Sequence, residues 1–248
     1  MTSEMFDELI EALPTAVLRR VQDHRLRWQF RRCWDGSPFY RARFEAAGLT
    51  PDTFAGLSDL KRLPPLTLAE LLRTEAQDWR VAPADWITGQ NGPAGLPARF
   101  LTAGDVAHEQ DRMARCRWAA NVERPSDYGN VPESATLLRS GDFRRLGVPS
   151  STGVLHIPHR PVDIPFVGAV VAYDCAQHDG YHLVEDHFLA EVVTSSGGRA
   201  IEDGEDGELV ITDLVREASP LIRFRTGLQA AVNRLACQCG RTSARLKW

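Results

Sequence analysis

The sequence lacks a long apolar run, a basic leader and an excess of positive charge. No stretch approaches the about 20 apolar residues that a membrane-spanning helix needs, and residues 1–13 carry acidic side chains where a secretory signal would carry basic ones. The net charge is −4, which argues against nucleic acid or an anionic membrane surface as the main partner. We therefore expect a cytoplasmic protein with neither a nucleic-acid partner nor a membrane partner.

The signatures of common catalytic machinery are also missing. The chain has no G-x-S-x-G elbow, no cysteine–histidine nucleophile spacing and no glycine-rich dinucleotide fingerprint. The five cysteines are an odd number, which in a reducing compartment argues against a disulfide framework. Cys33 and Cys116 lie within helical patterns, and we expect both to be small buried core residues.

Helical signals dominate the first half of the chain. Leu26, Phe30 and Cys33 recur at helical spacing, so residues 15–34 are expected to form an amphipathic helix. The sequence Asp-Gly-Ser-Pro at 35–38 should end it, and Thr67 should cap a later helix. The other expected helices are residues 41–47, 68–73 and 102–122.

Strand signals dominate the last third. Residues 188–193 and 208–212 bracket a loop rich in glycine and aspartate, which predicts a β-hairpin with a long tip. The other expected strands are residues 166–173, 221–225 and 230–232. The predicted fold class is α/β in a mixed α+β form, with a helical N-terminal part followed by a sheet-rich C-terminal part.

Six segments of the chain, taken together and in their order, resemble the motifs of one family. They are SPFYR at 37–41, the stretch 60–72, DGYHLVEDHF at 179–188, GELV at 207–210, PLIRFRTG at 220–227 and CQCGRT at 237–242. In these segments the chain resembles the phenylacetate–CoA ligases, a family of adenylate-forming aryl-CoA ligases, over most of 20–124 and 165–248. The corresponding family motifs read DGLHIxEDHF, GELV, PLIRYRT and CxCGRT.

The resemblance implies a shortened N-terminal domain of an adenylate-forming ligase, as one ligase-like domain over residues 1–248. Residues 1–124 would be a helical lead with a degenerate phosphate loop, 125–164 a shortened central segment, and 165–248 a β-rich part that bears zinc. The family's small C-terminal domain with its catalytic lysine would begin where the chain stops, at Trp248, and we expect it to be absent.

The phosphate loop is the clearest departure from the family. There the family reads approximately Ser-Ser-Gly-Thr-Thr-Gly-Lys-Pro, because hydroxyls and backbone amides must converge on a polyanion. The matching residues of this chain are Gln90, Asn91, Gly92, Pro93, Ala94, Gly95, Leu96 and Pro97. Both threonine hydroxyls and the lysine are missing, and Pro93 also removes an amide donor.

Three further departures concern the nucleotide. The family's ribose-binding aspartate matches Leu228, and its metal-binding glutamate in the YGLSE motif matches Pro165. The resemblance also implies that roughly a hundred residues of the family's central nucleotide-binding subdomain are replaced here by the short segment 125–164. We therefore expect that the chain uses neither ATP nor Mg²⁺ and has lost ordinary adenylation.

A tetrahedral ligand set remains. Cys237 and Cys239 form a C-x-C pair, and Cys175 with His182 supplies two more ligands, which as three thiolates and one imidazole suit structural zinc. The alternative is a reduced C-x-C turn without metal. A catalytic zinc would need an open coordination position, which a filled four-ligand set does not offer.

Other polar groups could carry a reaction. His156 and His159, with Asp163, lie in the segment that has no family counterpart, and a histidine can act as a general base at neutral pH. Glu185 and His187 form a second catalytic candidate. For both sets the alternative is a solvated or structural role.

Two arginines are the candidates for substrate binding. Arg223 and Arg225 could anchor a substrate carboxylate by charge-assisted hydrogen bonds, or they could be internal salt-bridge partners.

Three functions remain open. The first is a repurposed enzyme that performs an ATP-independent cyclisation, condensation or elimination on an aromatic acid, an acyl thioester or a related metabolite. The second is a non-catalytic subunit that binds a carrier protein or a full-length ligase, and the third is a ligase completed in trans by a partner. Loss of whole subdomains exposes apolar surface, which makes a homodimer a candidate assembly.

Overall fold

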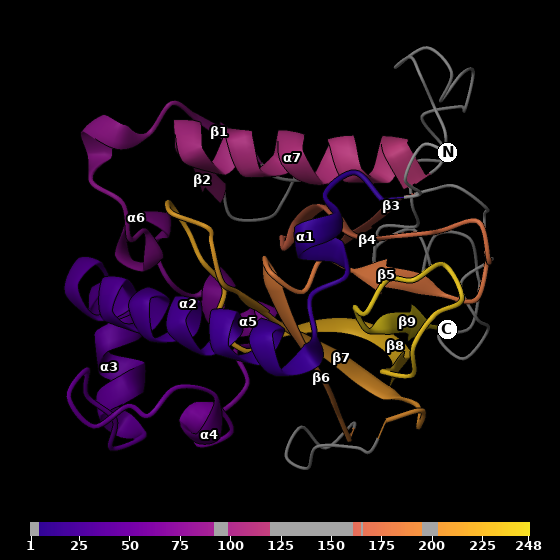
Figure 1. Ribbon diagram of the computed structural model, residues 1–248. Helices are drawn as coiled ribbons and strands as arrows, with labels where there is room; N and C mark the ends of the chain where they lie inside the picture. The colour runs from indigo at the N-terminus through magenta and orange to yellow at the C-terminus, as the bar shows by residue number, and fades with distance from the viewer. Residues whose placement is uncertain (1–4, 92–98, 120–160, 165, 195–202) are drawn as a thin grey trace, which may run out of the picture.

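The computed structural model describes residues 5–91, 99–119, 161–164, 166–194 and 203–248 (Figure 1). Its helices come first in the chain, as the sequence predicts. They are α1 (Glu8–Glu11), α2 (Thr15–Gly36), α3 (Pro38–Ala46), α4 (Leu57–Leu60), α5 (Leu68–Leu72), α6 (Ala76–Trp79), the 3₁₀ turn η1 (Ala84–Trp86) and α7 (Ala103–Ala119). None of the helices in these described ranges is long and apolar enough to cross a membrane.

The strands follow and form a seven-stranded antiparallel sheet in the order β3-β4-β5-β9-β8-β7-β6. They are β3 (Pro161–Ile164), β4 (Gly168–Tyr173), β5 (Tyr181–Leu183), β6 (Phe188–Val193), β7 (Gly207–Asp213), β8 (Phe224–Asn233) and β9 (Arg245–Lys247). Two further strands, β1 (Gly89–Asn91) and β2 (Arg99–Leu101), pair separately before α7. The predicted mixed architecture, helical first and sheet-rich later, is confirmed.

The corner between α2 and α3 shows how the local sequence sets the direction of the backbone. The side chain of Ser37 caps α3 by accepting a hydrogen bond from the backbone amide of Tyr40 at 3.2 Å, and Pro38 occupies the first helical position. The helix predicted for 41–47 therefore begins three residues sooner. A side chain at Gly36 would collide with the carbonyl of Val81, so only glycine allows this close approach of two backbones.

The apolar face of α2 builds the first part of the core. Leu26, Phe30 and Cys33 are buried as predicted, and the ring of Phe30 stacks at 4.0 Å on both Phe44 and Phe54. The predicted cap at Thr67 is also confirmed, because Thr67 and Glu70 form a reciprocal capping box at the start of α5. Propensity and packing agree in this half of the molecule.

The strand predictions hold in part. The predicted hairpin is confirmed as β6 and β7, which pair from Phe188↔Asp213 to Val193↔Glu208. The prediction of two short strands at 221–225 and 230–232 is wrong, since one continuous strand, β8, runs from Phe224 to Asn233. Gly227 has φ 74, and the register of β7 against β8 shifts between Glu208 and Val210. The turn formers thus make a bulge inside a strand and do not end it.

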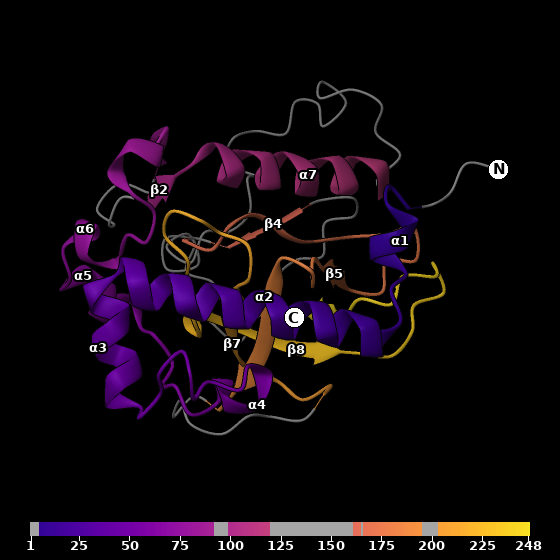
Figure 2. The same ribbon diagram turned by 60° about the vertical axis from the view of Figure 1, so that its left-hand side comes forward.

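Helix α7 lies alongside β4, while α2 to α6 lie below α7 in the view of Figure 1. The turned view of Figure 2 keeps α7 next to β4. The buried side chains of α7 are Asp105, Arg112, Arg115 and Cys116, so the face that meets the sheet is largely charged. Cys116 is 1% exposed, which confirms the prediction of a core cysteine.

The α2–α3 corner gives a direct test of stability. The hydroxyl of Ser37 is buried, accepts from the amide of Tyr40 and donates to the carbonyl of Asp78 at 2.6 Å. Ser37→Ala removes both bonds and should lower the free energy of unfolding by about 1–2 kcal/mol in urea denaturation. Ser58→Ala, on the exposed side of α4, should change it by less than about 0.5 kcal/mol; equal losses in the two variants would contradict this account.

Candidate functional site

Four predicted metal ligands meet at one corner of the sheet. Cys175 follows β4, His182 lies on β5, and Cys237 and Cys239 lie in the loop between β8 and β9. Because β4, β5 and β9 are neighbours in the sheet, residues far apart in the sequence converge here. All four are buried, and their ligand atoms lie within 4.8 Å of one another.

The distances suit a tetrahedral ion. Tetrahedral zinc with Zn–S near 2.3 Å and Zn–N near 2.0 Å implies about 3.8 Å between two sulfurs and about 3.5 Å between a sulfur and a nitrogen. The Sγ atoms of Cys175 and Cys237 are 3.8 Å apart, and Sγ of Cys239 is 3.4 Å from Nε2 of His182. The residues are therefore close enough, and of the right chemistry, to bind a metal ion.

Neighbouring groups orient these ligands. Ser243 Oγ lies 3.0 Å from Nδ1 of His182, which leaves Nε2 facing Cys239. Arg241 hydrogen-bonds Cys239, and the carboxylate of Glu11 holds Arg241 in turn at 2.6 Å. The contact with Cys175, followed by that with His182, lowers the pKa of the Cys239 thiol, so a negative charge is favoured on this sulfur.

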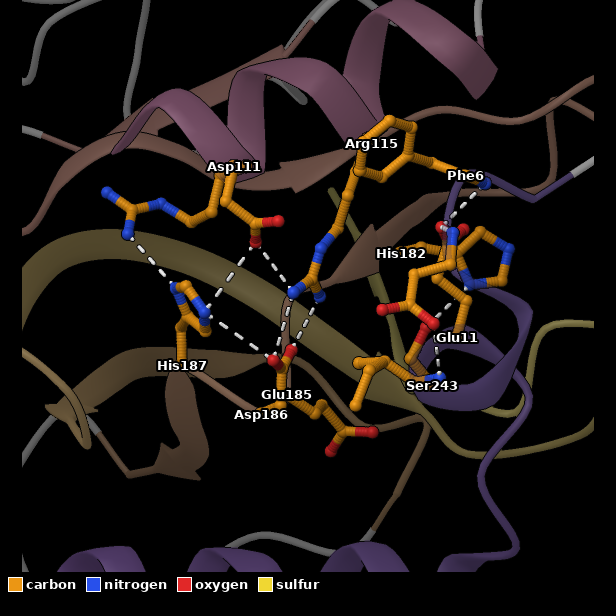
Figure 3. A network of polar contacts seen from close by, with 12 residues as sticks. Phe6, Glu11, Asp111, Arg115, His182, Glu185, Asp186, His187 and Ser243 are labelled. Atoms are coloured by element: carbon orange, nitrogen blue, oxygen red, sulfur yellow. Dashed lines mark hydrogen bonds and ion pairs between the residues drawn. The ribbon is translucent and has the colours of Figure 1, made fainter. Parts of the chain in front are cut away.

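A second cluster joins α7 to the segment between β5 and β6. Arg115 makes two hydrogen bonds to the carboxylate of Asp186, at 2.8 and 3.1 Å, and a second ion pair to Asp111 at 2.6 Å. Figure 3 shows His187 facing Asp111 and Asp186, with Arg115 reaching both carboxylates. Nδ1 of His187 lies 3.1 Å from a guanidinium nitrogen of Arg112 and must accept from it.

His187 is held neutral by this geometry. Burial lowers its pKa well below the ordinary 6.5, and the cations Arg112 and Arg115 add to that effect against the attraction of Asp186. With Nδ1 accepting from Arg112, the proton of the neutral ring sits on Nε2 and points toward the two carboxylates. His187 is thus buried and hydrogen-bonded, and its predicted catalytic role stays a prediction.

The remaining predicted catalytic residues lie in different places. Glu185 accepts a hydrogen bond from the amide of Ala244 at 2.8 Å, and burial raises the pKa of its carboxyl. Asp163 lies on β3 and accepts from the amide of Val170 at 2.8 Å, again with a pKa raised by burial. His156 and His159 lie outside the described residues, so their predicted catalytic role stays a prediction.

Both predicted substrate-binding arginines have internal ion pairs. Arg223 is buried and bonds both carboxylate oxygens of Glu191 at 2.9 Å, as well as the carbonyl of Leu63. Arg225 pairs with Glu208 at 3.0 Å. The internal salt bridges that the sequence allowed are therefore present, and substrate binding by these arginines stays a prediction.

The degenerate phosphate loop is described only where it begins. Gln90 lies on β1 and pairs with Phe100 of β2, and the backbone of Asn91 belongs to the same strand. Gly92, Pro93, Ala94 and Gly95 lie outside the described residues, as does Pro165. Leu228 is described, and its side chain packs against the main hydrophobic core.

The buried face of α7 is not the one that apolar patterning predicts. Trp118 is 46% exposed, while Arg112 and Arg115 are buried. Asp105, Arg112 and Arg115 recur at helical spacing, and this periodicity of charge is the sequence signal for the buried face. The general rule that buried faces are apolar points away from it.

Sequence comparison relates the chain to a ligase family. It is 26% identical to the phenylacetate-coenzyme A ligase of Escherichia coli (strain K12) over 295 residues, which covers 88% of this chain and 68% of that protein. It is also 26% identical to the enzyme of the same name from Thermus thermophilus over 327 residues, with 98% and 72% covered. No protein-family profile matches the chain.

Solved structures show the same fold. The structure of a 2-hydroxyisobutyryl-CoA ligase in an open conformation superposes with a TM-score of 0.81 at 19% identity, over 99% of this chain and 77% of that one. Another structure of a 2-hydroxyisobutyryl-CoA ligase, in the postadenylation state, gives 0.79 at 18% identity, over 99% and 69%. The chain thus has the fold of adenylate-forming CoA ligases.

The neutral state of His187 predicts a pH dependence of stability. Its folded pKa lies below the unfolded value of about 6.5, so the unfolded chain binds the extra proton first and stability falls as the pH drops below 6.5. The loss should reach up to about 1.4 kcal/mol per pH unit.

The test compares free energies of unfolding between pH 7.5 and 5 for wild type and His187→Gln. The difference in free energy of unfolding between the two proteins should shrink steadily as the pH falls, because only the wild type loses the stability that neutral His187 contributes. His24→Gln, at an exposed site on α2, is the matched control and should run parallel to wild type. Parallel curves for His187→Gln as well would refute the assignment.

Proposed function

Because the chain is a relative of the phenylacetate–CoA ligases, we propose that it keeps their scaffold but has lost ATP-dependent adenylation. In this proposal it performs an ATP-independent reaction, namely a cyclisation, condensation or elimination, on an aromatic acid, an acyl thioester or a related metabolite of a biosynthetic pathway. Such reactions depend on binding and orientation more than on an activating group.

The observation that carries this proposal is the chemistry at the expected nucleotide positions. The stretch 90–97 offers neither the hydroxyls nor the lysine with which the family resemblance would hold phosphates. At the expected ribose position stands Leu228, an apolar side chain packed against the core, which can accept no hydrogen bond from a sugar hydroxyl.

The length of the alignments supports the same view. The match to the Thermus thermophilus enzyme extends over 327 residues, whereas this chain has 248, so that relative has residues that this chain lacks. A shortened central segment at 125–164 would account for such a gap, and the central part of the family is where the resemblance places nucleotide contacts.

We further propose that the metal corner binds one structural zinc ion. All four tetrahedral positions would be filled by Cys175, His182, Cys237 and Cys239. The zinc ion would therefore cross-link the turn after β4 to the loop before β9. Three thiolates buried side by side would need a cation between them, and Arg241 would offset the remaining negative charge of such a site.

Two further parts of the proposal concern the surroundings of the protein. The odd cysteine count and the reduced ligand set fit a cytoplasmic location. A small acid or acyl metabolite is the proposed partner, and a carrier protein, a complete ligase or a second copy of the chain are the alternatives that pull-down and sizing experiments would reveal.

Loss of adenylation predicts no response to nucleotide. ATP with Mg²⁺ should give no saturable rise in the thermal midpoint, and the chain should catalyse no ATP–pyrophosphate exchange with phenylacetate or benzoate, because phosphate and ribose contacts are missing. The phenylacetate-coenzyme A ligase of Escherichia coli serves as the positive control. A saturable thermal shift with ATP would sink the proposal.

Structural zinc predicts a loss of stability on chelation. Metal analysis should find about one zinc per chain, and removal should cost about 3–5 kcal/mol, or about 10 °C in the thermal midpoint for a chain of this size. Cys239→Ser should lose the metal, whereas Cys33→Ala, in the apolar core, should lower stability but retain it. Retention of a full complement of zinc by Cys239→Ser would contradict the ligand assignment.

A further inference from the structure

The segment 5–13, which contains α1, packs on the loop that carries the C-x-C pair. The backbone carbonyl of Glu11 accepts from the amide of Thr242 at 3.1 Å. The carbonyl of Leu13 accepts from the Thr242 hydroxyl at 2.6 Å. The segment supplies none of the four predicted metal ligands, yet it is hydrogen-bonded to the loop that supplies two of them.

A single buried carboxylate joins the segment to the metal corner. Glu11 is 5% exposed, and each of its oxygens accepts two hydrogen bonds. Oε2 accepts from Nε of Arg241 at 2.6 Å and from the hydroxyl of Tyr173 at 3.0 Å. Oε1 accepts from the backbone amides of Phe6 and Asp7, each at 2.9 Å (Figure 3). One oxygen thus holds the segment itself, and the other holds groups that lie against the metal corner.

Arg241 connects Glu11 with a metal ligand. Its guanidinium hydrogen-bonds Cys239 and lies over the ring of Tyr173, 5.6 Å from the ring centroid. The charge-assisted bond to Glu11 fixes the orientation of the guanidinium. Groups that orient metal ligands from outside the ligand set change metal affinity by about 10–100-fold when they are removed.

The other end of the segment contacts α7. Phe6 meets Trp118 edge-on, with ring centroids 6.1 Å apart. Both residues are 46% exposed, so this contact lies at the surface, whereas the carboxylate of Glu11 is buried with all of its hydrogen bonds. Docking of the segment therefore depends mainly on Glu11.

We propose that residues 5–13 form a strap that sets how tightly the metal corner holds its ion, with Glu11 as the positioning residue. The inference rests on the proposed zinc ion and goes beyond it, because it assigns part of the metal affinity to a segment without a ligand. Coupling between two sites is reciprocal, so removal of the ion should also loosen the strap.

Glu11→Gln tests the strap at its centre. Glutamine keeps the size of the side chain but has one acceptor oxygen, so it cannot serve both Arg241 and the amides of the strap. In competition with a coloured chelator of known affinity, the Kd for zinc should rise about tenfold. Two controls should keep the wild-type Kd, namely Glu8→Gln on the exposed side of α1 and Ser37→Ala, which lowers stability at the α2–α3 corner.

The outcomes separate the strap from the metal site. Wild-type protein without bound zinc would overturn both. An unchanged zinc Kd in Glu11→Gln would refute the strap alone, as would an equal rise in Ser37→Ala, because that rise would trace the effect to general stability. If Glu11→Gln does not fold, Tyr173→Phe makes the same test with a smaller expected rise, since it loses the hydroxyl bond to Glu11.

The reverse coupling gives a second readout. In hydrogen–deuterium exchange, removal of zinc by chelation should speed the exchange of a peptide that contains the amides of Phe6 and Asp7, because Glu11 holds both. Exchange of α3 should rise less. An equal rise in both peptides, or unchanged exchange of residues 5–13, would contradict the strap.

Discussion

Buried charge is the constraint on which the placement of α7 depends. This helix meets the sheet through Arg112 and Arg115, which are almost fully buried, so each guanidinium must find acceptors at fixed positions. The bidentate pair between Arg115 and Asp186 fixes the rotation of the helix and the turn between β5 and β6 at once. Removal of either partner would leave an uncompensated buried charge, which costs several kcal/mol. An apolar interface would tolerate sliding, whereas this one does not.

A second buried pair connects the start of the chain with the loop before its last strand. Glu11 accepts from Arg241 at 2.6 Å and from the hydroxyl of Tyr173 at 3.0 Å, and its other oxygen caps the amides of Phe6 and Asp7 at 2.9 Å. Since Arg241 also contacts Cys239, the order of the metal corner and the docking of α1 are physically coupled. The segment that precedes α2 thus packs on the loop that carries the C-x-C pair.

The sequence predicts those parts of the fold in which local pattern and tertiary packing agree. Apolar spacing predicts α2, a loop rich in glycine and aspartate between two strand-like runs predicts β6 and β7, and cysteine spacing predicts a ligand set that the structure brings within 4.8 Å. It fails where tertiary structure reverses a local rule. At α7 the buried face is charged and Trp118 is exposed. At β8, Gly227 lies in a bulge inside the strand and does not end it. Neither outcome follows from propensity, because both depend on partners distant in sequence.

The reversal at α7 carries an energetic cost. Arg112 and Arg216 gain nothing from burial by themselves, because desolvation of a guanidinium is costly and their carbonyl and carboxylate partners leave Nη1 of Arg216 without an acceptor among the described residues. Along α2 and the β6–β7 hairpin, by contrast, sequence and structure agree. The burial of Arg112 and Arg216 therefore carries a free-energy cost that the packing of the rest of the fold must offset.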